Sequence, residues 1–130
     1  MVNEKTLLSN GNDSIVIKKH IMGIEGGRVL DVTGFAETVI KAGHIIIKTE
    51  AGEYAPMPVS GSAYAVLPEN ATYVGVLKAS ILTKKPYAAI TTWGIVNEAC
   101  LPYAVTSIKE NFLKACPHIE FTQDEKFTKE

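Results

Sequence analysis

Five residues carry the side chains that most often do chemistry in proteins: His20, His44, His118, Cys100 and Cys116. The histidines lie in separate extended segments, without a cysteine or carboxylate at the spacings typical of metal ligands. Two cysteines are too few for a disulfide scaffold or a four-cysteine zinc site. We therefore expect surface or partly buried structural histidines, and reduced thiols that pack as small apolar groups.

Cys116 and His118 are the pair whose spacing comes nearest to that of a catalytic thiol and its base. Such a pair needs a third group to orient the imidazole, and none stands beside these residues, which flank Pro117. The carboxylates lie mostly in turns or beside lysines, not in acid and base pairs. The sequence predicts a protein that is not an enzyme and uses no metal or cofactor.

Charge and hydropathy favour no nucleic-acid or membrane partner. The 130 residues include 13 basic and 14 acidic side chains, and the densest basic runs are Lys18-Lys19 and Lys84-Lys85. A nucleic-acid-binding protein would need a basic stripe. No apolar run approaches the roughly 18 residues of a membrane helix, and residues 1–14 lack the apolar centre of a secretory signal. These features predict one domain in a cytoplasm.

The most informative element is a hairpin formed by HIIIKT, EAGE and YAPM. The β-branched residues Ile45–Ile47 favour a strand, and Gly52 suits a turn. Pro56 and Pro58 lack a backbone donor, so the second strand should be short and at a sheet edge.

Both faces of the isoleucine strand must be covered. Successive side chains alternate, so Ile46 must point away from the side that Ile45 and Ile47 share. A closed barrel, a second layer or a neighbouring subunit could cover them. The candidates for a subunit interface are therefore Ile45, Ile46, Ile47 and Tyr54.

The rest of the chain reads as further strands and one helix. The strands are expected at residues 15–21, 28–35, 71–82 with a break or bulge at Gly75, 87–96 and 118–121. Trp93 is expected in the core, and the glycine-rich GIEGGR in a turn. A helix is predicted from Ser107 to Ala115, with Ser107 and Glu110 as a capping box and Pro117 beyond its end.

These elements define a mostly β domain of the α+β class, either β-barrel-like or a β-sandwich, with one short helix near its end. Residues 1–14 are predicted to be a flexible amino-terminal arm, residues 15–121 a single β-rich domain and residues 122–130 a loose tail.

Five segments follow one another in the second part of the chain: AGHIIIKTEAGEYAPM, YVGVLKASIL, AAITTWGIVNEACLP, SIKENFLKA and HIEF. Their order resembles that of the bacteriophage head decoration proteins of the lambda type, and the related name head fibre protein also suits the chain. The likeness covers residues 41–121 and rests on the order of strand and turn motifs. Residues before Thr38 depart from the pattern.

The resemblance implies a virion protein that is assembled in the bacterial cytoplasm, binds the outside of an expanded head and stabilises it as a trimer on the major capsid protein. It implies no catalytic residues. It also implies an arm that becomes ordered on the capsid, with contact candidates Val2, Leu7, Leu8, Ile15 and Ile17.

Two other functions remain open at this point. One is a small-molecule-binding β-barrel, or an enzyme subunit with a site between chains, in which Trp93, Tyr87 and a histidine line a pocket. The other is an adhesin-like domain displayed on a phage particle, which glycan binding would distinguish from a clamp.

Overall fold

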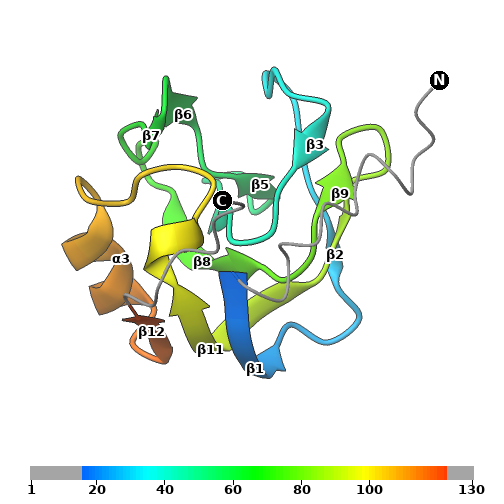
Figure 1. Ribbon diagram of the computed structural model, residues 1–130. Coiled ribbons are helices and arrows are strands. Elements are labelled where there is room, and N and C mark those ends of the chain that lie inside the picture. Colours follow the sequence, from blue (N-terminus) through cyan, green and yellow to red (C-terminus); the bar gives the residue numbers. More distant parts are fainter. Residues whose placement is uncertain (1–15, 123–130) are drawn as a thin grey trace, which may run out of the picture.

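The computed structural model describes residues 16–122 and is built mainly from short strands (Figure 1). The elements are β1 (Ile17–Gly23), β2 (Arg28–Val29), β3 (Val39–Ile40), β4 (Ile45–Lys48), β5 (Tyr54–Pro56), β6 (Val59–Ser60), β7 (Ala63–Tyr64), β8 (Thr72–Leu77), β9 (Ile81–Leu82), β10 (Tyr87–Ala88), β11 (Ile90–Asn97), the 3-10 helix η1 (Glu98–Cys100), helix α3 (Lys109–Ala115) and β12 (Ile119–Thr122). The expected mostly β domain with one short late helix is confirmed.

The main sheet has six strands in the order β1-β11-β8-β4-β5, with β12 also paired to β11. The pairs β10-β2, β3-β9 and β6-β7 form separate two-stranded sheets. Within residues 16–122 these sheets do not close into a barrel, so that part of the expectation is wrong. Short strands joined by tight turns leave the main sheet open at β1 and β5.

The predicted hairpin is present as β4 and β5, which pair antiparallel with Ile46 opposite Pro56 and Lys48 opposite Tyr54. Gly52 has a φ of 89°, which a residue with a Cβ adopts only at a cost. As the prolines predicted, β5 has three residues and lies at the edge of the sheet.

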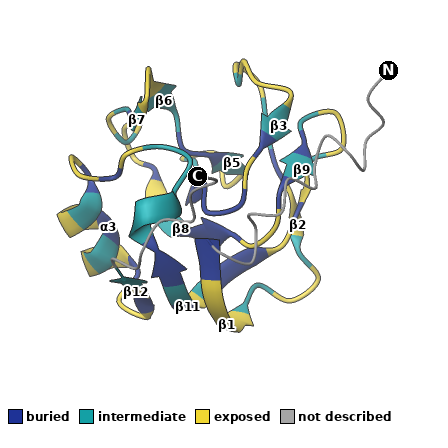
Figure 2. Cartoon of the chain, viewed as in Figure 1, coloured by how far each residue is buried: buried dark blue, intermediate teal, exposed yellow. Residues whose placement is uncertain are grey.

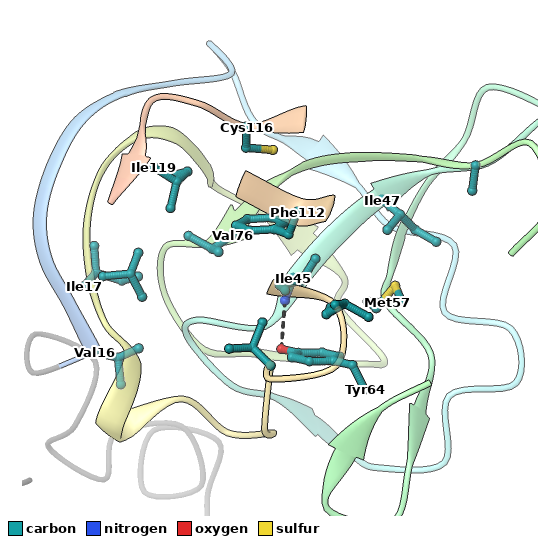
Figure 3. Packing of buried hydrophobic residues seen from close by; sticks show 14 residues of the cluster. Val16, Ile17, Ile45, Ile47, Met57, Tyr64, Val76, Phe112, Cys116 and Ile119 are labelled. Atoms are coloured by element: carbon teal, nitrogen blue, oxygen red, sulfur yellow. Dashed lines mark hydrogen bonds between the residues drawn. The ribbon is translucent and has the colours of Figure 1, made fainter. Parts of the chain in front are cut away.

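The isoleucines of β4 alternate between two hydrophobic clusters, as expected from the strand period. Ile45 and Ile47 belong to a first core cluster, together with Val76 and Phe112, part of which Figure 3 shows. Ile46 belongs to a second core cluster, with Leu77 among its members. Segments of the same chain therefore cover both faces of β4, and Figure 2 shows this buried centre in dark blue.

The bulge predicted near Gly75 is also present. The adjacent residues Ile46 and Ile47 pair with Gly75 and Tyr73, so Val74 is an extra residue on β8. A Cβ at Gly75 would collide with the carbonyl oxygen of Thr91 on the neighbouring β11. Glycine is therefore needed where β8 approaches β11 closely.

Helix α3 ends where expected and begins later than expected. It spans Lys109–Ala115, and its N-cap is Ile108, which makes no side-chain capping bond. The predicted capping box of Ser107 and Glu110 is therefore wrong. Ile108 is buried in the first core cluster, and its N–H donates to the carbonyl of Val105 at 3.0 Å. Packing of these apolar residues in a turn sets the start of the helix.

Two predicted strands are divided. The segment 87–96 is split at Ala89 into β10 and β11, and the segment 71–82 is split after Leu77 into β8 and β9. The last strand β12 forms as predicted, with both Ile119 and Phe121 packed in or against the first core cluster.

Candidate functional site

The one candidate thiol and imidazole pair is not arranged for nucleophilic catalysis. Cys116 is buried in the first core cluster, and burial raises the pKa of its thiol to about 11. The protonated thiol is a poor nucleophile. His118 is exposed and lies instead against Trp93, with 5.2 Å between the ring centroids. Among residues 16–122, no group of three or more histidine, cysteine and carboxylate residues could hold a metal ion.

His44 is the most enclosed titratable group of the chain's described part. The rings of Phe35, Tyr64 and Tyr103 surround it edge to face, with centroid distances of 5.4, 5.3 and 5.4 Å. The expectation of a surface or partly buried histidine is wrong here, because the loops bearing Phe35 and Tyr103 fold over it. We call these four residues the aromatic cluster.

The hydrogen bonds of the aromatic cluster are structural. His44 Nε2 donates to the carbonyl oxygen of Met57 at 2.9 Å, and Nδ1 has no partner. Burial lowers the pKa of His44 to about 4, so the imidazole is neutral near pH 7. The Tyr64 hydroxyl accepts from the Ile45 N–H at 3.0 Å, as Figure 3 shows. The cluster thus joins β4 to β7 and to the segment after β5.

Three of the four predicted subunit-interface residues are not available to another chain. Ile45, Ile46 and Ile47 are completely or almost completely buried. Their assignment to an interface is wrong, because the two core clusters cover both faces of β4. Tyr54 is partly buried, and the Arg28 guanidinium and the Lys48 ammonium each lie 5.6 Å from its ring centroid.

One of the five predicted capsid-contact residues lies in the core. Ile17 is the first residue of β1, inside the strand expected at residues 15–21, and it is buried in the first core cluster, so its side chain is not free for the capsid contact assigned to it. Its pairing with Val96 of β11 fixes it in the sheet. Val2, Leu7, Leu8 and Ile15 lie outside the described residues.

The prediction that Trp93 belongs to the core is wrong. Its side chain is 41% exposed, and its partner across the strands, Met22 of β1, is 55% exposed. Tyr87 of β10 is 70% exposed and pairs with Val29 of β2, which is 60% exposed. Two cross-strand pairs of large apolar side chains are thus exposed to solvent, one between β1 and β11 and one between β2 and β10. This placement follows from long-range pairing, so the local sequence pattern did not reveal it.

Two neighbouring open cavities lie beside Met22 and beside the Val29–Tyr87 pair, and Trp93 lines neither of them. A cavity of about 530 Å³ is lined by residues including Ile21 and Met22. A neighbouring cavity of about 460 Å³ is lined by residues including Val29 and Tyr87. Both reach Ala89, the residue that separates β10 from β11. We call the exposed residues Ile21, Met22, Val29, Tyr87 and Trp93 the apolar surface.

Positive charge lies at the edge of the apolar surface. Lys78 lines the larger cavity and Arg28 lines the smaller one. His20 Nδ1 lies 2.8 Å from the Thr91 hydroxyl, and burial followed by the Lys78 charge lowers the pKa of His20. Glu25 is the one carboxylate among the residues that line the two cavities. Tryptophan, tyrosine, methionine and arginine are the residue types enriched where proteins bind proteins.

No helix within residues 16–122 has the length and apolar character needed to cross a membrane. Comparisons of the chain with protein-family models, with curated proteins and with solved structures found no match.

Proposed function

We propose that the chain is a non-enzymatic phage structural protein that decorates the outside of the head and stabilises it as a homotrimer on the major capsid protein. The observation that carries this proposal is the apolar surface, where Met22, Trp93, Val29 and Tyr87 face solvent on paired strands. A set of exposed apolar side chains on a packed β domain is typical of a protein-binding surface.

The order of elements also supports the proposal. The segments that resemble the decoration proteins contain β4, β5, β8, β9, β11, η1, α3 and β12 in turn. The cavities at the apolar surface are open, whereas small-molecule sites usually enclose most of the ligand. The virion is then the expected location, with assembly in the host cytoplasm.

The experiment is a sedimentation assay with purified heads of the source phage, in expanded and unexpanded forms. We expect saturable binding of the full chain to expanded heads and greater resistance of those heads to heat. Equal, non-saturable association with both forms would overturn the proposal. As a control, bovine serum albumin at the same concentration shows how much unbound protein is carried into the pellet with the heads.

The predicted arm is tested in the same assay. A variant lacking residues 2–14 should keep the thermal unfolding transition of the domain and lose binding to heads, because three arms on one trimer act together through avidity. Substitution of Val2, Leu7 and Leu8 by serine in the full chain should weaken binding in the same direction. Unchanged binding of both variants would remove the arm from the proposal.

Small-molecule binding is the second candidate function, and one observation favours it. A cavity of about 340 Å³ combines the apolar side chains of Phe35, Ile47 and Pro56 with the polar groups of Asp31 and Thr49. A thermal-shift screen of metals and metabolites tests it, since a ligand of the native state raises stability by mass action. Stabilisation by one chemical class that Asp31→Asn removes would favour this function over decoration.

A further inference from the structure

One loop presents an apolar side chain almost completely to solvent. Val66, in the segment that follows β7, is 85% exposed. Its neighbour Leu67 packs against the first core cluster. The Ala65 N–H donates to the Pro58 carbonyl at 2.9 Å, and the Ala71 N–H donates to the Pro68 carbonyl at 3.1 Å. The fold therefore holds Val66 outward on an anchored loop, which reduces the entropy lost on binding.

This loop and the apolar surface lie on different sides of the molecule. In Figure 1, β7 is at the upper left, whereas β1 is at the bottom and β2 is at the right. The loop that bears Val66 therefore cannot reach the cavities of the apolar surface in its own chain. They can meet between two copies in a head-to-tail contact.

The charges of the two regions are complementary. Arg28 and Lys78 line the two cavities, and Glu25 is the one carboxylate that lines them. Residues 59–70, which form β6, β7 and the loop, contain one glutamate and no lysine or arginine. That glutamate, Glu69, is exposed three residues after Val66. Opposite charges at a contact select the orientation and raise the association rate.

We infer that the loop of residues 65–69 in one copy seats on the apolar surface of the next copy, with Val66 in the cavities that Met22, Val29 and Tyr87 line. Each copy then offers one loop and one surface, so the contact is heterologous, and three such contacts related by a three-fold axis would close the proposed homotrimer into a ring. This inference rests on the proposed homotrimer and names the surfaces that form it. It replaces the buried isoleucines as the subunit interface.

The test begins with the mass of the full chain, 14.1 kDa per copy, by light scattering over a concentration series. We expect a species of three chains for the wild type. Val66→Glu and Trp93→Glu should each shift this species to the monomer, because each places an unpaired carboxylate in an apolar contact. The control Thr106→Glu adds the same charge at an exposed position before α3 and should remain trimeric.

Mixing the two variants separates a head-to-tail contact from other interfaces. Val66→Glu keeps its apolar surface and Trp93→Glu keeps its loop, so an equimolar mixture retains one native contact and should form a species of two chains. A symmetric contact between two apolar surfaces would leave Val66→Glu assembled, and this result would overturn the inference. Failure of the mixture to associate at any concentration would also overturn it.

The remaining controls distinguish a loss of trimer formation from a loss of folding and from a loss of binding to heads. Each variant must keep the circular dichroism and unfolding midpoint of the wild type; if Trp93→Glu does not, Met22→Glu takes its place. A wild type that is monomeric at every concentration overturns the inference even if it binds heads. A wild-type trimer that the variants dissociate, but that does not bind heads, supports the inference and overturns the proposed function.

Discussion

The aromatic cluster and the apolar surface use similar residues in opposite environments. In the cluster, Tyr64 and Tyr103 enclose His44 and exclude water. On the surface, Trp93 lies against His118 and stays 41% exposed. Residue type alone therefore does not separate a buried, fold-determining side chain from one that stays exposed. Burial from several elements makes the cluster a stabilising feature, whereas exposure leaves the surface free to gain stability from a partner.

The two regions also differ in how they respond to solvent. His44 is neutral because burial lowers its pKa to about 4, and its Nδ1 atom has no partner. The charged groups beside the apolar surface, Arg28 and Lys78, are at the rims of open cavities. We expect pH to act mainly through the cluster and ionic strength mainly through the surface, since exposed charges are screened by salt.

The largest expected effect is at the buried strand that supports the cluster. Ile46→Ala should lower the free energy of unfolding by about 2–5 kcal/mol, because it opens a cavity in the second core cluster. Ile21→Ala, at an exposed position, should change it by less than about 0.5 kcal/mol. Urea unfolding measures both. If both variants lowered the free energy of unfolding equally, the buried strand and the exposed surface would not differ in their contribution to stability.

The second effect is the pH dependence of the cluster. His44 has its ordinary pKa of 6.5 when unfolded and about 4 when folded, so below pH 6.5 the unfolded state binds a proton that the folded state excludes. Stability should therefore be full above pH 6.5 and fall as the pH decreases to 4, by about 1.4 kcal/mol per unit and about 3 kcal/mol in total. Below pH 4 this group adds no further loss.

Urea unfolding at several pH values measures this dependence, and His44→Phe is the variant that should flatten it. The aromatic replacement keeps an apolar ring beside Phe35, Tyr64 and Tyr103. If the slope between pH 4 and 6.5 is the same in both proteins, other groups must cause it.

A smaller effect is expected at the hydroxyl that links the cluster to β4. Tyr64→Phe leaves the buried Ile45 N–H without its acceptor, so the free energy of unfolding should fall by about 1–3 kcal/mol. Tyr87→Phe, which removes an exposed hydroxyl, should have no measurable effect. Thermal unfolding compares the two, and an equal response would show that the Ile45 bond contributes little.

The smallest effect on the single chain is expected on the apolar surface itself. Met22→Ser should change the free energy of unfolding of the dilute monomer by less than about 0.5 kcal/mol, since Met22 is largely exposed. The same change should weaken self-association, because Met22 lies opposite Trp93. Sedimentation velocity in a concentration series measures association. A large decrease in the free energy of unfolding of the monomer would show that the Met22 side chain contributes to the folded core.

Local patterns predicted a good part of the fold. The two prolines placed β5 at an edge, and strand alternation sent Ile46 to a different cluster from Ile45 and Ile47. Pro117 correctly limited helix α3. These features depend on residues that are neighbours in the sequence, and their steric rules act before any tertiary contact forms.

The candidate site was less predictable. Trp93 was expected in the core and Ile17 among the capsid contacts, and both positions depend on how β1 pairs with β11. The cavity-lining segments of β1, β2 and β10 come from distant parts of the chain. Hydrophobicity indicates that a side chain favours burial, but it does not say which partner will cover it.

The sequence by itself determined the type and approximate place of most elements: β-branched runs made strands, Gly52 and the prolines limited the β4–β5 hairpin, and alternation required two covered faces on β4. Only the tertiary structure decided that those faces are covered within one chain and that Met22, Trp93, Val29 and Tyr87 remain exposed. The physical reason is that local sterics act between adjacent residues, whereas burial depends on strand order and on which segments far apart in the chain come together.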